Sequence, residues 1–442
     1  MSGPQLAIGI PAVYIERRAR LAQLMQRGVA VVPTAREQAR NRDAHYPYRY
    51  DSYFYYLTGF PEPEAVLVQI AGDAPKSILF CRERDPEREV WDGFRLGPEQ
   101  ARAKFGFDEC HVIGELDARM PQLLADQPQL FCHLGGDEPW NRRVLGWIDA
   151  VRAQARSGVT APAAIHDVRA LLDEMRLVKD AHEVATMRRA AQISTDAHRR
   201  AMRATKPGRA EYEIEAELLH EFRRRGAQAP AYTPIVAGGA NACVLHYVQN
   251  DALLKAGDLL LVDAGCELDG YATDITRTYP VSGRFEPAQR DVYQMVLAAQ
   301  AAAIAEVKPG TQWIAPHDAA LRVLAQGLID FGLCQGSVDK VIETGDYQKF
   351  YMHRTGHWLG LDVHDAGDYK RDSRWRELKP GMVLTVEPGC YIRAGDGVPQ
   401  RFANIGIRIE DDVLVTAAGN EVLTQAAPKT VGAIEALMQS GG

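Results

Sequence analysis

The sequence predicts two domains: an α/β domain over residues 1–172, followed by an α+β domain over residues 173–442 that consists of two similar halves. With 442 residues, the chain exceeds the roughly 250–300 residues at which a single hydrophobic core stops growing. Its first part alternates short β-branched or aromatic segments with helical ones, which is typical of α/β domains. Its second part contains an internal repeat.

The composition is that of an ordinary globular protein, with 46% hydrophobic and 25% charged residues. The formal net charge of -7 argues against nucleic acid or an anionic membrane as the main partner. No apolar stretch approaches the roughly 20 residues of a membrane helix, and no basic segment precedes an apolar run at the amino terminus. Seven scattered cysteines without a C-x-x-C pair favour a reducing compartment, so a cytoplasmic location is expected.

The first domain is predicted from short segments that are mostly β-branched or aromatic. Strands are expected at residues 29–32, 53–59, 65–70, 77–81 and 130–134, and helices at 15–26 and 98–105. Polar and small residues at 156–162 predict a linker. A helix at 166–176 is then expected to lead into the second domain, with the boundary near residue 173.

The repeat aligns residues 255–265 (KAGDLLLVDAG) without gaps on residues 379–389 (KPGMVLTVEPG). The lysine, both glycines and two aliphatic positions match, and an acid ends each apolar strand, Asp263 in one copy and Glu387 in the other. Lys-x-Gly before a strand is a common turn, so this match alone does not distinguish duplication from coincidence.

A second feature repeats in the same order, because each copy is preceded by a helix, the tripeptide Lys-Pro-Gly and another helix. The helices are expected at residues 182–205 and 211–225 in the first copy, and at 291–307 and 316–331 in the second. Tyr212, Ala216 and Leu219 are expected to form the apolar face of the helix at 211–225. Two matched features favour duplication over coincidence.

Each half supplies a second acid. A turn after Asp263 leads into a strand at residues 273–278, so a hairpin is expected to bring Asp263 and Asp274 onto adjacent strands. In the second half, a strand at 404–410 alternates three isoleucines with Gly406, Arg408 and Glu410. Because alternate residues share a face, these three are expected to face away from the packed side, with Gly406 leaving room there.

Four converging acids require compensation, since buried like charges cannot all stay ionised. Four carboxylates with one histidine would balance two divalent cations. Such an oxygen-rich set favours Mn²⁺ or Co²⁺ over a thiolate-selected Zn²⁺ site. Any single acid is more often an exposed surface charge, but Asp263 and Glu387 end apolar strands.

Three of the twelve histidines fall in one short segment, at His353, His357 and His364. The first two are four residues apart, but the glutamate of the zinc helix motif H-E-x-x-H is missing and Gly356 interrupts the spacing. A glycine-interrupted loop around a site is therefore expected instead. His246, just before a Tyr-Val-Gln-Asn turn, is a fourth candidate.

The segments VDAG-x7-TDITRTY, HRTGHWLGLDVHD, LTVEPGCYI and GIRIEDD resemble the pita-bread metalloenzymes, which include methionine aminopeptidase, prolidase and aminopeptidase P. The resemblance implies a duplicated, pseudo-twofold pita-bread domain with two divalent ions, Mn²⁺ first and Co²⁺ or Zn²⁺ as alternatives. It implies these metal ligands: Asp263, Asp274, His357, Glu387 and Glu410. Metal-free relatives such as creatinase lack the full set.

The resemblance also implies roles in catalysis. His246, His353 and His364 would contact substrate or act near the metals, Arg408 would support them, and Glu387 would also move a proton.

Residues 44–65 resemble the amino domain of bacterial aminopeptidase P, which methionine aminopeptidases lack. The implied activity is metal-dependent hydrolysis of the bond between an N-terminal residue and a following proline, in a homotetramer or a homodimer. The amino domain would serve substrate access and oligomerisation, with Trp91 lining a neighbouring subunit's active site. Trp358, Leu359 and Tyr391 are expected to form an apolar pocket for the proline ring.

Two other functions compete with this one. Prolidase, which cleaves Xaa-Pro dipeptides, has the same metal centre. A metal-free pita-bread protein would serve as a binding module or chaperone subunit, and the five intact ligands argue against that class.

Overall fold

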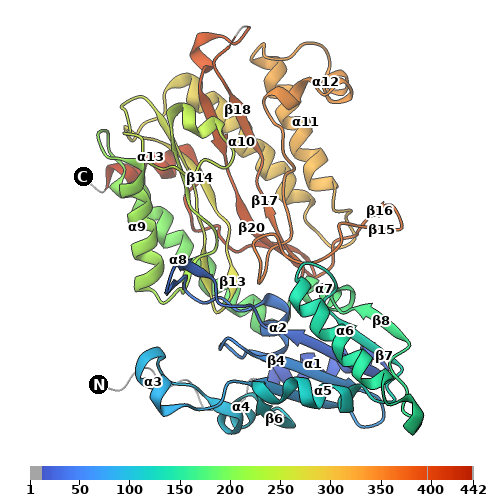
Figure 1. Ribbon diagram of the computed structural model, residues 1–442. Coiled ribbons are helices and arrows are strands. Elements are labelled where there is room, and N and C mark those ends of the chain that lie inside the picture. Colours follow the sequence, from blue (N-terminus) through green and yellow to red (C-terminus); the bar gives the residue numbers. More distant parts are fainter. Residues whose placement is uncertain (1–11, 396, 441–442) are drawn as a thin grey trace. The chain divides into compact units, whose positions relative to one another are not determined.

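The computed structural model describes residues 12–395 and 397–440 and divides the chain into two compact units (Figure 1). The first unit ends at Met175 and the second begins at Arg176. The helix α7 (Arg169–Leu177) ends two residues beyond this division. No helix in the described ranges is both long and apolar enough to cross a membrane.

The first unit is built on a six-stranded sheet with the order β6-β5-β4-β1-β7-β8. Its strands are β1 (Gly28–Pro33), β4 (Val66–Ala71), β5 (Lys76–Cys81), β6 (Glu109–Val112), β7 (Gln129–Cys132) and β8 (Ala164–Asp167), beside a small hairpin of β2 (Ala39–Asn41) and β3 (Ala44–His45). Strand β4 runs antiparallel to both neighbours, and the other pairs are parallel. Mixed sheets of this kind are common in α/β domains.

Helices complete the core of this unit. They are α1 (Ala12–Met25), α2 (Ser52–Thr58), α3 (Pro86–Asp92), α4 (Gly97–Phe105), α5 (Leu116–Leu124) and α6 (Glu138–Arg152), with short 3-10 turns η1 (Ile113–Glu115) and η2 (Ala155–Ser157). Alternate residues of β1, Val29 and Val31, pack with Met120 of α5 and Trp147 of α6 in one buried cluster. This alternation is what a strand of a sheet provides.

Two predictions in this unit are wrong. Residues 53–58 lie in helix α2 and not in a strand, because Asp51 accepts a hydrogen bond from the Phe54 amide at 2.9 Å and Gly59 caps the helix in the left-handed region at φ 61°. These two caps override the β preference of an aromatic run. Residues 156–162 are no interdomain linker, since β8 follows them and pairs with β7 in the same sheet.

The second unit holds the repeat. Its helices are α8 (Ala181–Ala204), α9 (Glu211–Arg224), α10 (Pro287–Glu306), α11 (Ala315–Asp330), α12 (Val338–Thr344) and α13 (Val431–Gln439), with short turns η3 (Gly239–Cys243), η4 (Asp346–Lys349) and η5 (Gln400–Phe402). The helix pairs α8/α9 and α10/α11 pack together, one pair from each half (Figure 1).

The strands of this unit form several small sheets. They are β9 (Ala229–Pro230), β10 (Ile235–Gly238), β11 (Leu259–Asp263), β12 (Cys266–Leu268), β13 (Tyr271–Ala272), β14 (Thr276–Pro280), β15 (Lys370–Arg371), β16 (Arg374–Trp375), β17 (Val383–Val386), β18 (Gly389–Ile392), β19 (Ile405–Arg408), β20 (Asp411–Thr416) and β21 (Gly419–Val422). The first half contributes the order β10-β11-β14 and the second β17-β20-β21. The repeated strands β11 and β17 each pair antiparallel with a later strand, β14 and β20.

The expected apolar face of α9 is wrong in part, because Leu219 packs against the core but Tyr212 and Ala216 are exposed. Tyr212 is 58% exposed, whereas Ile214, Leu218 and Phe222 are buried. The buried residues lie four apart and belong to the face two positions further along the helix, which packs into the large core of this unit.

Candidate metal centre

All four predicted acids lie at or near the ends of strands. Asp263 is the last residue of β11, and the next acid, Asp274, lies two residues before β14. The predicted hairpin is therefore interrupted, because β12 and β13 form their own small pair between the two acids. Glu387 directly follows β17, and Glu410 lies in the link between β19 and β20.

The histidine loop lies against β17, which positions His357. The Thr385 amide donates to the His357 carbonyl at 2.9 Å, and the Glu387 amide donates to the Thr355 carbonyl at 2.8 Å. A side chain at Gly356 would approach the Thr385 carbonyl oxygen to 2.1 Å. Glycine is therefore required there for the loop to run this close to the strand.

These segments enclose a cavity of about 310 Å³. It is lined by Leu245, His246, Asp263, Asp274, His353, Arg354, Gly356, His357, His364, Glu387, Arg408 and Glu410. Single ligand atoms of Asp274, His357 and Glu410 lie within 4.8 Å of one another. Nε2 of His357 is 3.4 Å from Oδ2 of Asp274 and 3.6 Å from Oε1 of Glu387. The structure thus brings all five predicted ligands to one cavity.

Crowding of these carboxyls shifts their proton affinities. Burial raises the pKa of Asp274, and the charge of Asp263 raises it further. The pKa of Glu410 is well above its ordinary value because the group is buried and faces other carboxylates, Asp274 most of all. Burial raises the pKa of Glu387 to about 7, although His357 acts in the opposite direction.

The same crowding shifts the pKa of the His357 imidazole. Burial opposes the charged form of His357, but its contact with Asp274 and the charge of Glu387 bring its pKa to about 9. The group of carboxyls therefore holds positive charge strongly. Divalent cations among oxygen donors and one imidazole would let all the acids ionise, so the donor set fits metal ions.

Arg408 supports two of the acids. Its Nη2 donates to Oδ2 of Asp263 at 2.6 Å, and its Nε donates to the Thr276 hydroxyl at 3.0 Å. That hydroxyl in turn donates to Oε2 of Glu410 at 2.6 Å. The guanidinium also donates to the Tyr391 hydroxyl at 2.9 Å. Arg408 therefore orients carboxylates from both halves of the unit.

The predicted catalytic histidines all line the cavity. Nδ1 of His353 faces the Arg354 carbonyl at 2.7 Å, so its Nε2 accepts from the Tyr391 hydroxyl at 2.9 Å. Burial, with the charge of Arg408, lowers the pKa of His353 to about 4. The ring of His364 lies 4.2 Å from that of His357, and burial lowers its pKa. His246 is exposed on its turn.

Two family models match the sequence. The model described as metallopeptidase family M24 matches residues 185–417, more than half of the chain. The chain belongs to metallopeptidase family M24. The model described as the aminopeptidase P N-terminal domain matches residues 14–131.

The M24 assignment is supported by relatives along nearly the whole chain. The Xaa-Pro aminopeptidase of Haemophilus influenzae is 45% identical over 427 residues, 96% of each chain. That of Escherichia coli K12 is 44% identical over 429 residues, 96% of this chain and 97% of the relative.

Solved structures agree with the relatives. Aminopeptidase PepP of Pseudomonas aeruginosa, 50% identical, superposes with a TM-score of 0.95 over 97% of this chain and 98% of its own. Zinc-substituted E. coli aminopeptidase P in complex with product, 44% identical, also gives 0.95 over 98% of both chains. The resemblance to aminopeptidase P and the predicted fold, an α/β domain followed by a pita-bread domain, are confirmed.

One contact of this M24 site was missed from the sequence. The Tyr232 hydroxyl lies 2.6 Å from Oδ1 of Asp263 and 2.5 Å from Oδ1 of Asp274, and donates its single proton between them. Burial and the two carboxylates raise the pKa of Tyr232 well above its ordinary value. The surrounding letters, Pro-Ala-Tyr-Thr-Pro, carry no charge or spacing that would have indicated this role.

The expected proline pocket is wrong. Trp358, Leu359 and Tyr391 are fully buried, and none of them lines the cavity. Trp358 bridges to Leu384 through its backbone and stacks on Tyr369 with ring planes 4° apart. These large side chains pack in the core behind the histidine loop and not around the cavity.

Two further expectations concern glycine and tryptophan. A side chain at Gly406 would come within 2.3 Å of the Ala242 carbonyl, so the space opposite it is taken by the backbone of η3.

Trp91 is 85% exposed on α3, a helix whose described residues are all outside the core. Val90 and Phe94 beside it are also exposed.

Proposed function

We propose that this chain is an Xaa-Pro aminopeptidase, which hydrolyses the bond between an N-terminal residue and a following proline and releases the first residue from peptides. The observation that carries the proposal is the convergence of four carboxyls and His357 on one cavity, in a chain that belongs to family M24 and matches Xaa-Pro aminopeptidases over 96% of its length. The match includes the amino-terminal domain.

We infer that the ligands of two divalent ions are Asp263, Asp274, His357, Glu387 and Glu410, with Asp274 and Glu410 shared between the ions. The raised pKa values of the buried acids support this assignment, because cations would relieve the crowding. Oxygen donors with one imidazole suit Mn²⁺ or Co²⁺, and a zinc-substituted form exists of the E. coli relative. Such ions supply an activated water and a polarised carbonyl.

The surrounding residues would complete the reaction. Glu387, whose pKa burial brings to about 7, is suited to carry a proton from the attacking water to the leaving proline nitrogen. His246 and His364 line the same cavity and would donate to the oxygen that becomes negative at the scissile carbonyl. Arg408 would hold Asp263, and Tyr391 would hold His353.

The proposed substrate is a peptide with proline in second position. The bond ahead of proline has a tertiary nitrogen and a restricted φ, so it needs a dedicated site. An aminopeptidase must leave the carboxyl side of that site open for the rest of the peptide. A prolidase instead needs a charged group there for the carboxylate of a dipeptide.

We propose a homotetramer in which the amino domain serves oligomerisation and substrate access. The exposed apolar side chains of Val90, Trp91 and Phe94 support a contact surface on α3 and the residues after it. A cytoplasmic location is supported by seven free thiols, six of them buried, which suits a reducing compartment.

Metal removal tests the proposal. Exhaustive chelation should abolish release of the first residue from an Xaa-Pro-Yaa tripeptide, and added Mn²⁺ or Co²⁺ should restore it, because the acids lose the cations that they are arranged to hold. Activity and metal content are measured on the same samples. An active protein that contains essentially no metal would contradict the proposal.

A further inference from the structure

Two buried polar side chains occupy equivalent positions in the repeated halves. His198 in α8 and Gln300 in α10 each lie eight residues before the Lys-Pro-Gly that follows their helix. Both side chains are fully buried. In each half, the same position of the first helix therefore carries a polar group into the core, where such a group is costly unless it is hydrogen-bonded.

The partners of Gln300 are the backbones that carry two of the acids. Its Nε2 donates to the Ile409 carbonyl at 3.1 Å and to the Val386 carbonyl at 3.3 Å. Ile409 directly precedes Glu410, and Val386 directly precedes Glu387. A single amide thus connects α10 to both segments from which the second half presents its carboxylates.

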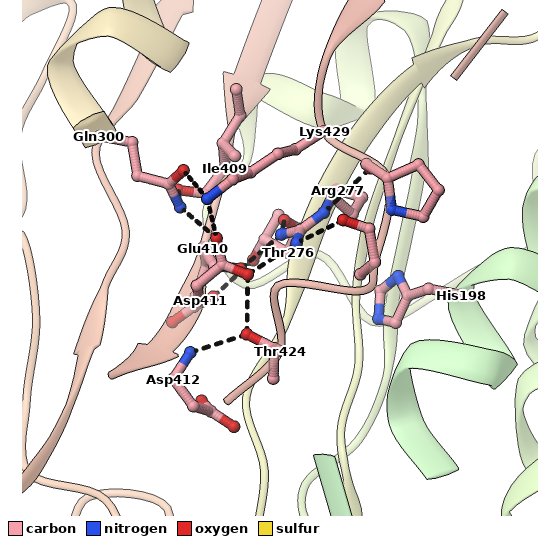
Figure 2. A network of polar contacts seen from close by, with 12 residues as sticks. His198, Thr276, Arg277, Gln300, Ile409, Glu410, Asp411, Asp412, Thr424 and Lys429 are labelled. Atoms are coloured by element: carbon pink, nitrogen blue, oxygen red, sulfur yellow. Dashed lines mark hydrogen bonds and ion pairs between the residues drawn. The ribbon is translucent and has the colours of Figure 1, made fainter. Parts of the chain in front are cut away.

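The orientation of this amide is fixed from its other side (Figure 2). Lys429 donates to Oε1 of Gln300 at 3.0 Å and to Oδ2 of Asp411 at 2.6 Å. The Gln300 amide nitrogen also donates to the same Asp411 oxygen at 3.0 Å, so its two hydrogens are shared among this oxygen and the two carbonyls. Because an ammonium faces the oxygen and acceptors face the nitrogen, the amide cannot be reversed without losing these bonds.

Arg277 holds the same link from the first half. Its Nη1 donates to the Glu410 carbonyl at 2.6 Å, and its Nη2 donates to Oδ1 of Asp411 at 2.7 Å (Figure 2). The backbone on either side of Glu410 is therefore held by buried donors from both halves.

His198 makes the corresponding contact in the first half. Its Nε2 lies 2.9 Å from the Ala264 carbonyl, and Ala264 directly follows Asp263. A carbonyl only accepts, so Nε2 carries the hydrogen. The two halves thus use one helix position to hold the backbone beside their repeated acids, Asp263 and Glu387.

We propose that Gln300 is a positioning residue that fixes the spacing between Glu387 and Glu410, and through it the affinity of the site for metal. The inference rests on the proposed metal ligands. A buried glutamine that only satisfies backbone carbonyls would add stability without affecting metal binding. The distinguishing feature is that its two carbonyl partners precede two different ligands, so losing the amide frees their relative position.

The test compares Gln300→Met with Gln289→Met, which alters the same helix. Gln289 is also buried, and its Nε2 donates to the Gly257 carbonyl at 2.7 Å, away from the carboxyls. Metal-stripped proteins are titrated with Mn²⁺ by calorimetry, and kcat, KM and the Tm of the stripped protein are measured. Gln300→Met should raise the apparent Kd for Mn²⁺ by about 10- to 100-fold and lower kcat, whereas Gln289→Met should lower Tm alone.

Wild-type Mn²⁺ affinity in a folded Gln300→Met protein would overturn the inference. Should that variant not fold, Lys429→Met decides, because this side chain is 24% exposed and its loss removes the donor that holds Oε1 of Gln300. It should also raise the Kd, by a smaller factor, and an unchanged Kd would overturn the inference. Failure of the wild-type protein to bind either Mn²⁺ or Co²⁺ would instead refute the proposed function.

Discussion

Asp274 and His364 lie in the same cavity and contact different groups. The Asp274 carboxylate lies 3.4 Å from His357 and close to Glu410, as a shared ligand would. The ring of His364 lies 4.2 Å from that of His357 in the same cavity, and His364 is not among the proposed ligands. We therefore expect the two side chains to affect different measurable quantities.

Replacing each by alanine separates the two roles. Asp274→Ala should lose metal and reduce kcat/KM by more than about 100-fold, since ligand loss exceeds the usual effect of an outer-shell change. His364→Ala should keep its metal and lose roughly 10²- to 10³-fold in kcat, as expected for a donor to the reacting oxygen. Metal analysis of both purified variants checks this. An empty site in His364→Ala would show that the division of roles is wrong.

His198 gives a prediction about pH. Burial lowers its pKa from about 6.5 to about 4 in the folded protein. Between pH 4 and pH 6.5, the imidazole is therefore protonated in the unfolded chain and neutral in the folded protein. Its contribution to stability is complete above about pH 6.5, and about 3 kcal/mol is lost as the pH falls toward 4.

His198→Gln checks that sign. Glutamine can still donate to the Ala264 carbonyl, as Gln300 does in the other half, but it does not titrate. The free energy of unfolding, measured with urea from pH 7 to 4, should fall less steeply in the variant than in the wild-type protein. Equal slopes would mean that His198 does not titrate in this range.

Helices and strands were predicted correctly where a single sequence pattern was clear. Strand β11 and helix α10 follow from an aliphatic run and from a long helical stretch between clear stops. Helix α2 was missed because its aromatic composition favours a strand, while the capping by Asp51 and Gly59 is worth about 1 kcal/mol or more and decides the conformation. The buried face of α9 was missed because the aromatic ring of Tyr212 suggests a core residue in the sequence, whereas this residue is 58% exposed.

Helix α3 carries the prediction for the amino-terminal unit. An exposed tryptophan that lines a neighbouring active site should help to bind peptides without affecting metal. Trp91→Ala should raise KM by up to about tenfold, which corresponds to about 1.4 kcal/mol, with metal content unchanged. Leu145→Ala, at another exposed apolar residue of the same unit, is the control. Wild-type kinetics for Trp91→Ala would remove this role.

In the chain as a whole, duplication explains why two of the five proposed ligands stand out in the sequence, while the full set was implied by the resemblance to the pita-bread metalloenzymes. Asp263 and Glu387 were recognised because the same pattern, an acid at the end of an apolar strand, occurs twice. Contacts between the halves could not be predicted, since the 2.6 Å bond between Arg408 and Asp263 joins residues 145 positions apart. Tyr232 was missed for the same reason: its partners depend on the folding of the strands.

The cavity needs both halves. The first half supplies Asp263 and Asp274, and the second supplies His357, Glu387 and Glu410. A single copy of the repeat would hold too few donors for the two proposed ions, so the proposed metal centre requires both halves.

The specificity for proline in longer peptides is tested most directly by comparing three substrates with the Mn²⁺-loaded protein: an Xaa-Pro-Yaa tripeptide, the same tripeptide with alanine in second position, and the Xaa-Pro dipeptide. Release of the first residue is followed by mass spectrometry, and kcat/KM is determined for each. The proposed function predicts efficient cleavage of the proline tripeptide, loss of most of kcat/KM with alanine, and clearly poorer cleavage of the dipeptide. A protein that prefers the dipeptide and leaves longer peptides intact would contradict it and would indicate a prolidase.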